Sequence, residues 1–177
     1  MDDRLLPAVY LGILVGLLLI AGVFLLRQVL KTRRVETTFM RLQSKLNKEK
    51  GTAQEHYELG GIYLDKKLYS QAIAQFQKAL KGKELSGADA IAPIHNAIGF
   101  AYTSQEQYDL AIRNYKEAID LKPDYVTALN NLGFAYEKKQ LIAQAVETYE
   151  VALKAEPKNA TAKRRSEALK KRLVPST

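Results

Sequence analysis

Two different hydrophobic patterns divide the chain. Residues 5–26 contain no charged side chain, and 15 of these 22 residues are Leu, Ile, Val or Phe. After residue 50, apolar positions recur in short segments separated by Gly, Pro and charged residues, as in a series of short helices. The pattern predicts one continuous apolar helix followed by an all-α domain.

Local signals place the helices after residue 50. Gly51 is expected to end the preceding helix. Thr52–Glu55 has the form of a capping box, which starts the next one. Gly87 and Asp89 mark another start, with Pro93 expected in its first turn. We expect helices over residues 53–66, 69–81, 89–104, 107–121, 124–138, 141–155 and 158–174.

A period of 34 residues relates two neighbouring segments between residues 92 and 157. Small residues, tyrosines and a proline at Gly99, Tyr102, Ala111, Tyr115, Ala118 and Pro123 return as Gly133, Tyr136, Ala145, Tyr149, Ala152 and Pro157. An earlier copy keeps the same internal spacing at Gly60, Tyr63, Ala72, Phe76 and Ala79. Five extra residues follow this copy, before the next repeat begins. This period resembles the tetratricopeptide repeat, a helix–turn–helix unit that stacks into a superhelix.

The repeated glycines need a physical reason, because glycine in a helix costs about 1 kcal/mol relative to alanine. We expect the second helix of each repeat to approach Gly99 and Gly133 closely, with Ala111 and Ala145 as the matching small residues. The prolines should end the second helices. The predicted fold class is all-α: an α-α superhelix of three repeats, residues 53–91, 92–125 and 126–159, with a basic capping helix and tail over residues 158–177.

The apolar segment Leu5–Leu26 is long enough to cross a membrane. At 1.5 Å per residue its 22 residues span roughly 33 Å, against about 30 Å of hydrocarbon. The alternative is a cleaved signal peptide, but Asp2 and Asp3 make the start acidic and no small-residue cleavage site ends the segment. We therefore expect a retained single-pass transmembrane helix.

Four cations follow this segment directly: Arg27, Lys31, Arg33 and Arg34. Because basic flanks stay on the cytoplasmic side, we expect the repeats there, or in the stroma of a plastid, with these cations at the membrane surface. Within the segment, Gly12 and Gly16 lie on one helix face, which would allow a homodimer through these small residues. The alternative is that glycine is simply common in membrane helices.

Residues 27–50 are expected to continue as a basic amphipathic connector. This stretch carries eight Lys or Arg against two Glu. A narrow apolar stripe runs along it at Val35, Phe39, Leu42 and Leu46. The connector could lie on an anionic leaflet, dock on the first repeat or meet a partner helix.

Charge and composition exclude several functions. The net charge is +8, but residues 51–157 carry 11 basic against 14 acidic side chains, so a mildly acidic repeat domain lies between two basic segments. The membrane explains those basic segments more economically than nucleic acid does. There is no cysteine and no catalytic motif, and His56 and His95 occupy equivalent repeat positions where Leu129 follows, which favours packing over a metal site. We expect no enzyme activity, no cofactor and no metal.

The first helices of the repeats should line a concave face that binds a peptide. Five residues are expected there: Tyr57, Asn96, Phe100, Asn130 and Phe134. The two asparagines would form one ladder that bonds a peptide backbone, and the two phenylalanines another that offers apolar pockets. The alternative is that an asparagine ladder only helps the helices pack. Some proteins of this repeat family hold a partner's C-terminal carboxylate with Lys and Arg, but the matching positions here carry no cation: Tyr57, Gly61, Ala97, Thr127 and Asn131.

The whole layout resembles one group of proteins, the membrane-anchored photosystem I assembly factors of cyanobacteria and algal plastids. The resemblance rests on the anchor, on the three repeats and on the connector, above all Leu26–Val29, Arg41–Gln43, Gly51–Glu55 and Tyr57–Gly60. It implies a thylakoid protein whose partners are photosystem I subunits or assembly intermediates. Without this resemblance the sequence indicates a membrane-tethered interaction scaffold. A bacterial scaffold for lipid or cell-wall assembly in the envelope is the alternative.

Overall fold

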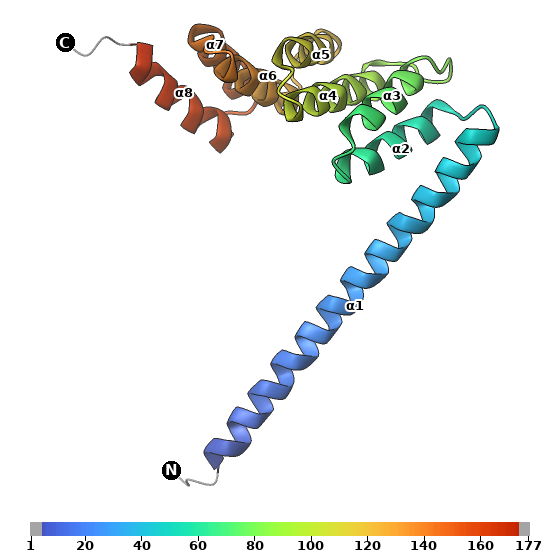
Figure 1. Ribbon diagram of the computed structural model, residues 1–177. Coiled ribbons are helices and arrows are strands. Elements are labelled where there is room, and N and C mark those ends of the chain that lie inside the picture. The colour runs from blue at the N-terminus through green and yellow to red at the C-terminus, as the bar shows by residue number, and fades with distance from the viewer. Residues whose placement is uncertain (1–4, 174–177) are drawn as a thin grey trace. The chain divides into compact units, whose positions relative to one another are not determined.

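The computed structural model describes residues 5–173, with side chains from residue 9 onward. The described residues form helices and turns, and the chain divides into two compact units, residues 1–48 and 49–177. Figure 1 shows their helices. The acidic start at Asp2 and Asp3 and the tail at residues 174–177 lie outside the described residues.

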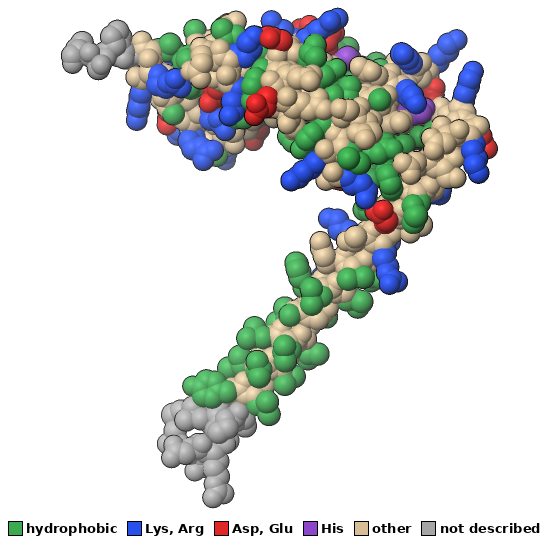
Figure 2. All heavy atoms as spheres, viewed as in Figure 1, with side chains coloured by type: hydrophobic (Ala, Val, Ile, Leu, Met, Phe, Trp, Pro, Cys, Tyr) green, Lys and Arg blue, Asp and Glu red, His purple; other side chains and the backbone are tan. Residues whose placement is uncertain are grey.

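The first unit is a single helix, α1 (Leu5–Lys48), which runs without interruption through the apolar segment and the connector. Its most apolar 18-residue window has a mean hydropathy of 2.8, so α1 is long and apolar enough to cross a membrane. Hydrophobic side chains cover this helix toward its N-terminus, and basic side chains follow toward its C-terminus (Figure 2). The expected continuation of the apolar helix into the connector is confirmed.

The second unit contains three helix pairs and a terminal helix within the described range. The pairs are α2 (Ala53–Asp65) with α3 (Tyr69–Leu80), α4 (Ala88–Ser104) with α5 (Tyr108–Leu121), and α6 (Val126–Lys138) with α7 (Ile142–Ala155). The terminal helix is α8 (Ala160–Leu173). Each helix begins and ends within two residues of its predicted bounds, and the predicted fold class is confirmed.

An aromatic ring of the second helix packs directly on the glycine of the first helix in all three repeats. A Cβ atom added to Gly60 would lie 2.6 Å from Cε1 of Phe76, and the same distance separates Gly99 from Tyr115. At Gly133 the Cβ would lie 2.7 Å from the Tyr149 ring. The expected close approach is confirmed, and the atoms nearest to the glycines belong to the aromatic rings rather than to Ala111 and Ala145.

The same turn joins the two helices of each repeat. Lys67, Glu106 and Gln140 have φ angles of 59°, 60° and 59°. In the first turn, Leu68 N–H donates to the Tyr63 carbonyl and Lys67 N–H to the Leu64 carbonyl, and the other two turns repeat both bonds. This pair of bonds around a left-handed residue is the Schellman motif, which satisfies the last carbonyls of the first helix.

Proline has two roles in the repeats, and one was mispredicted. Lys122 and Glu156 are extended before Pro123 and Pro157, so these prolines end α5 and α7 as predicted. Pro93 was predicted in the first turn of its helix and lies in the second. The reason is that α4 begins at Ala88, after Gly87 with φ of 92°, so Pro93 is the sixth helical residue. Proline there removes an N–H that would donate to the Asp89 carbonyl.

The five extra residues after the first repeat fold back onto the start of α2. Thr52 and Glu55 form the predicted capping box. The Ala53 N–H donates to Oε1 of Glu84 in the loop at 2.6 Å. A Cβ at Gly82 would lie 2.4 Å from the Cβ of Ala53, so only glycine allows the loop to come this close. The loop thus caps the exposed end of the first repeat.

The first helices form the inner side of the superhelix. Neighbouring first helices contact each other, α2 with α4 and α4 with α6, whereas each second helix reaches the following repeat through that repeat's first helix. The outer helices α3, α5 and α7 are therefore spread apart, and α2, α4 and α6 line the concave face. The apolar core lies between the two layers, with Tyr115, Tyr149 and Phe76 as its largest fully buried side chains.

Candidate functional site

Phe100 is the one large apolar side chain of the inner helices α2, α4 and α6 that is exposed. It lies on α4, and 46% of its surface is exposed although it is a large apolar side chain. An apolar ring exposed on an inner helix loses no internal packing when it contacts a partner, so it can contribute hydrophobic binding energy. The predicted role of Phe100 as an apolar contact remains a proposal, and this exposure supports it.

The two predicted asparagines are engaged within the protein. Asn131 Nδ2 donates to Oδ1 of Asn96 at 2.9 Å, and Asn96 Nδ2 lies 3.5 Å from the Tyr125 hydroxyl. Asn130 Nδ2 donates to Oδ1 of Asn159 at 3.3 Å. Both side chains therefore bridge to the next inner helix or its N-terminal end. Their geometry favours the packing alternative that the sequence left open, and peptide binding by these asparagines stays a prediction.

Asn159 links this bridge to the last helix. Its side-chain oxygen also accepts from the Ala162 N–H at 2.9 Å, which is the bond of an N-cap residue. Asn130 thus contacts the cap of α8. Its own Oδ1 is buried and has no hydrogen-bond partner among the described residues.

Phe134, which follows Phe100 by 34 residues, lies between two cations. The Lys138 Nζ is 5.4 Å from its ring centroid, and the Arg165 Cζ is 5.0 Å from it. Such cation–π contacts contribute about 0.5–1 kcal/mol at partly exposed sites. The second phenylalanine is therefore a platform for two positive charges rather than an open pocket.

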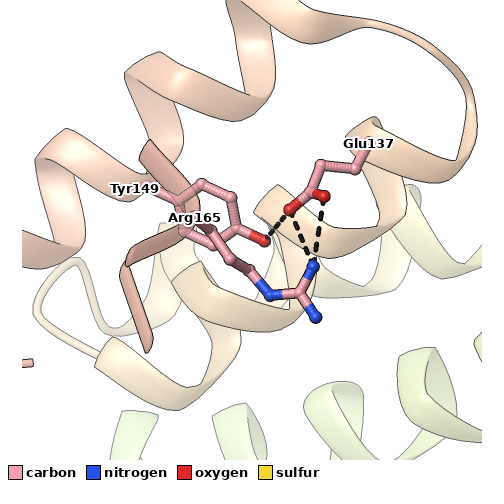
Figure 3. Close-up of polar contacts among 3 residues, drawn as sticks. All are labelled: Glu137, Tyr149 and Arg165. Carbon is pink, nitrogen blue, oxygen red and sulfur yellow. Dashed lines mark hydrogen bonds and ion pairs between the residues drawn. The ribbon is translucent and has the colours of Figure 1, made fainter. Parts of the chain in front are cut away.

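A polar cluster holds Arg165 in place (Figure 3). Arg165 Nη1 lies 3.1 Å from both carboxylate oxygens of Glu137, and the Tyr149 hydroxyl donates to Glu137 Oε1 at 2.6 Å. Burial, together with this hydrogen bond to a carboxylate, raises the pKa of Tyr149 above its ordinary value. The three side chains come from α6, α7 and α8, so the cluster fixes the capping helix to the third repeat.

The second repeat has a neutral version of this cluster. The Tyr115 and Thr103 hydroxyls lie 3.0 Å apart, and burial raises the pKa of Tyr115 to about 12. Thr103 and Glu137 are equivalent positions, as are Tyr115 and Tyr149. Only the third repeat, therefore, places a carboxylate beside the buried phenol, and it is there that Arg165 binds.

Tyr57, the remaining predicted face residue, is partly buried on α2. Its ring lies 5.8 Å from that of Phe76, so it packs against the ring that fills the space beside Gly60. The Tyr57 side chain thus contributes to the first repeat's packing as well as to its surface.

The two histidines lie apart from any metal-like cluster among the described residues. His56 Nδ1 lies 2.8 Å from Gln75 Oε1, a contact between α2 and α3. His95 is partly buried on α4, and its Nδ1 has no hydrogen-bond partner among the described residues. The environment of His56 supports the packing interpretation.

The predicted membrane-surface cations and the two glycines lie on α1. Arg27, Lys31, Arg33 and Arg34 are exposed along the helix just beyond its apolar part. Apart from each glycine's chain neighbours, no described side chain comes within 4 Å of a Cβ built at Gly12 or Gly16. Their roles in membrane contact and in a homodimer remain proposals.

Three residues of the face were missed from the sequence. Asn131, Lys138 and Arg165 were not predicted, although the first lies beside Asn130 and the others flank Phe134. The repeat register contains the signal for Arg165, because it follows Asn131 by 34 residues and so extends the inner face onto α8.

Comparison with known proteins supports the repeat assignment. The family model described as "TPR repeat" matches residues 94–140, and the one described as "Tetratricopeptide repeat" matches residues 54–81 and 126–159. The first tetratricopeptide domain of Spaghetti (RPAP3), solved with an HSP90 peptide, has a TM-score of 0.62 at 22% identity and covers 69% of this chain and 93% of that chain. At this identity the likeness concerns the fold alone. Tetratricopeptide domains are protein-interaction scaffolds.

Two relatives cover much of the chain. The ycf37 protein of Guillardia theta is 39% identical over 127 residues, which are 72% of this chain and 71% of that protein. The chloroplastic protein PYG7 of Arabidopsis thaliana is 36% identical over 164 residues, which are 93% of this chain but 54% of that protein. The chain therefore spans about half the length of PYG7. It belongs to the ycf37 family of tetratricopeptide repeat proteins.

Proposed function

We propose that this protein is a membrane-tethered, non-enzymatic scaffold that assists the assembly or stability of photosystem I. Its clients would be photosystem I subunits or assembly intermediates, bound through the concave face. It would be a single-pass protein of the thylakoid membrane with its repeats on the cytoplasmic or stromal side. The plastid relatives and the resemblance of anchor and connector support this assignment.

The exposure of Phe100 is the observation that carries client binding. The asparagines and Phe134 are occupied by contacts within the chain, whereas Phe100 offers an apolar ring on an inner helix with 46% of its surface exposed. Tethering through α1 would confine the protein to the plane of its clients. Tethering raises the effective concentration, so a modest affinity would suffice.

Co-purification of tagged protein from gently solubilised membranes tests this function. The informative variant is Phe100→Ser, and the control is Val151→Ser, because Val151 is an apolar side chain on the outer helix α7 with 38% of its surface exposed. We expect photosystem I subunits with the wild type and the control, and a loss of at least half of them with Phe100→Ser. Envelope-assembly proteins in place of photosystem subunits would contradict the proposal.

A double change at Asn130 and Phe134 is a less useful test. Asn130 bonds to the cap of α8, and Phe134 lies beneath Arg165. Alanine at both positions would disturb the docking of α8, so a loss of clients could arise from damage to the fold. Phe100 has no such role.

A further inference from the structure

The charge of the concave face changes sign along the superhelix. One position of the inner helices reads Glu58, Ala97, Asn131 and Arg165 from the first repeat to α8. A second position, seven residues later in each helix, reads Asp65, Ser104, Lys138 and Arg172. Both series begin with an acid and end with an arginine, so the positive charge collects at the C-terminal end.

Contacts with neighbouring residues define where three cations lie at the C-terminal end of the concave face. Lys138 and Arg165 approach the Phe134 ring, at 5.4 and 5.0 Å from its centroid. Arg165 and Arg172 are seven residues apart on α8, so they lie on the same helix face. Arg172 donates to Oε1 of Gln140, just past the end of α6, at 3.2 Å. Three cations therefore follow the boundary between α8 and α6, and basic side chains gather over α8 in Figure 2.

One of these cations is paired with a described carboxylate and the other two are not. Arg165 is bound to Glu137, and the side chains of these two residues are only 32% and 20% exposed. Lys138 and Arg172 are exposed, and neither forms an ion pair among the described residues. With Glu137 counted against the three cations, the site has a formal charge of +2. Charges placed around an apolar ring favour a ligand that offers both carboxylates and apolar groups.

We propose that this end of the concave face binds an acidic segment of a client protein. Carboxylates of the segment pair with Lys138 and Arg172, while its apolar side chains pack on the exposed ring of Phe100. The inference rests on the proposed client binding and adds the chemistry of the client. The site differs from the carboxylate-binding arrangement sought in the sequence, since Lys138 and Arg172 lie outside the five positions that define it.

An extended peptide fits this location better than a membrane surface. The cations lie along the inner helices α6 and α8, and two of them lie beside the Phe134 ring of α6. A flat anionic bilayer reaches convex surfaces and edges, whereas an extended chain can follow the inner helices.

An unbiased peptide library displayed on phage tests the inference. The full chain, held in nanodiscs of neutral lipid, selects from random twelve-residue peptides. The variant is Lys138→Gln with Arg172→Gln. The matched control is Lys116→Gln with Lys154→Gln, which removes the same charge from exposed positions on the outer helices α5 and α7.

We expect the wild type and the control to select peptides enriched in Asp and Glu, and the variant to lose this enrichment. The affinity of the best acidic peptide should fall about tenfold in the variant, and the affinity of the wild type should itself fall as salt is raised. Selection of peptides without an acidic excess, or the same peptides with the variant, would overturn the inference and leave the proposed function standing. Selection of no peptide by any protein would contradict peptide binding itself.

A membrane arm identifies the other anionic ligand. The same proteins are mixed with vesicles of phosphatidylglycerol and sedimented. If the variant loses vesicle binding that the control keeps, and no acidic peptide is selected, the site binds lipid and the proposal is wrong.

Discussion

Two neighbouring glycines on α2 isolate the effect of one contact at the residue scale. A Cβ at Gly60 would lie 2.6 Å from the Phe76 ring, whereas a Cβ at Gly61 would meet nothing within 4 Å. Phe76 is fully buried, so its ring cannot move aside freely. The two positions share a helix and a residue type, and they differ in burial and in this contact.

We predict opposite effects for alanine at these two positions. Gly60→Ala should destabilise the repeats by about 1–3 kcal/mol, because an added methyl group overpacks the core. Gly61→Ala should stabilise them by about 0.5–1 kcal/mol, because alanine restricts the unfolded chain and favours the helix. Thermal unfolding followed by circular dichroism in detergent measures both. Equal effects at the two positions would show that the ring does not define the contact.

The close contact at the repeated glycines could be predicted in part from the sequence. A repeated glycine inside a helix indicates a close contact, and the structure confirms one. The partner could not be identified, because an alanine and a tyrosine recur with the same period and only their side-chain directions decide which fills the space. Side-chain direction also decides the role of Asn96 and Asn130. The sequence predicts that they bind a peptide, but their amides bond to the next inner helix or its N-cap.

Glu84 should make the free energy of unfolding depend on pH. The Ala53 N–H that it accepts lowers the pKa of this carboxyl below its ordinary value. A carboxyl with a lower pKa in the folded state stabilises the fold above its unfolded pKa of about 4.3, and this contribution is lost as the pH falls through the folded pKa.

The variant Glu84→Gln keeps an acceptor oxygen but removes the charge. We predict that it unfolds more readily than the wild type at pH 7, and that the difference shrinks between pH 5 and pH 3 in urea titrations. A difference that stays constant over this range would show that the charge has no part in capping α2.

At the scale of elements, α8 acts as the inner helix of an incomplete fourth repeat. It buries Ala162, Ser166 and Leu169, and it uses Arg165 where the preceding inner helix has Asn131. A solenoid needs such a terminal helix to cover its last apolar surface. The Glu137–Arg165 ion pair therefore contributes to the stability of the third repeat and to the geometry of the concave face.

We predict that Arg165→Ala lowers the stability of the repeats by about 1–2 kcal/mol, because Glu137 loses its charged hydrogen-bond partner and Phe134 loses a cation. Arg164→Ala is the control, since Arg164 is the adjacent, exposed residue and its change should stay within about 0.5 kcal/mol. Urea unfolding at pH 7 compares the two. Equal losses would mean that the polar cluster does not fix α8.

Several helix boundaries could be predicted closely because they carry a local signal, such as the capping box at Thr52 or the prolines after α5 and α7. Contacts between distant residues could not. Glu84 reaches Ala53 across 31 residues, and this depends on how the extra loop folds back. The position of Pro93 in the second turn was also not predicted, because α4 begins at Ala88, directly after Gly87, and not at Asp89.

At the scale of the whole molecule, α1 combines an apolar segment with a basic continuation. The 15 large apolar residues of the segment favour insertion by about 4–9 kcal/mol. We predict that Val15→Arg with Leu18→Arg abolishes membrane retention, since two arginines near the centre cost about 5–7 kcal/mol. Thr32→Arg with Thr37→Arg adds the same charge beyond the segment and should leave retention unchanged. Extraction of membranes with alkaline carbonate distinguishes them, and retention of both variants would contradict a transmembrane α1.

The most direct test of the scaffold function is photo-crosslinking in intact thylakoid membranes. A photoreactive phenylalanine analogue is placed at Phe100 on the concave face or at Val151 on the outer face, and the adducts are identified by mass spectrometry. We predict adducts with photosystem I subunits at position 100 and far fewer at position 151. Adducts at position 151 alone, or adducts at position 100 only with proteins unrelated to photosystem I, would contradict the account.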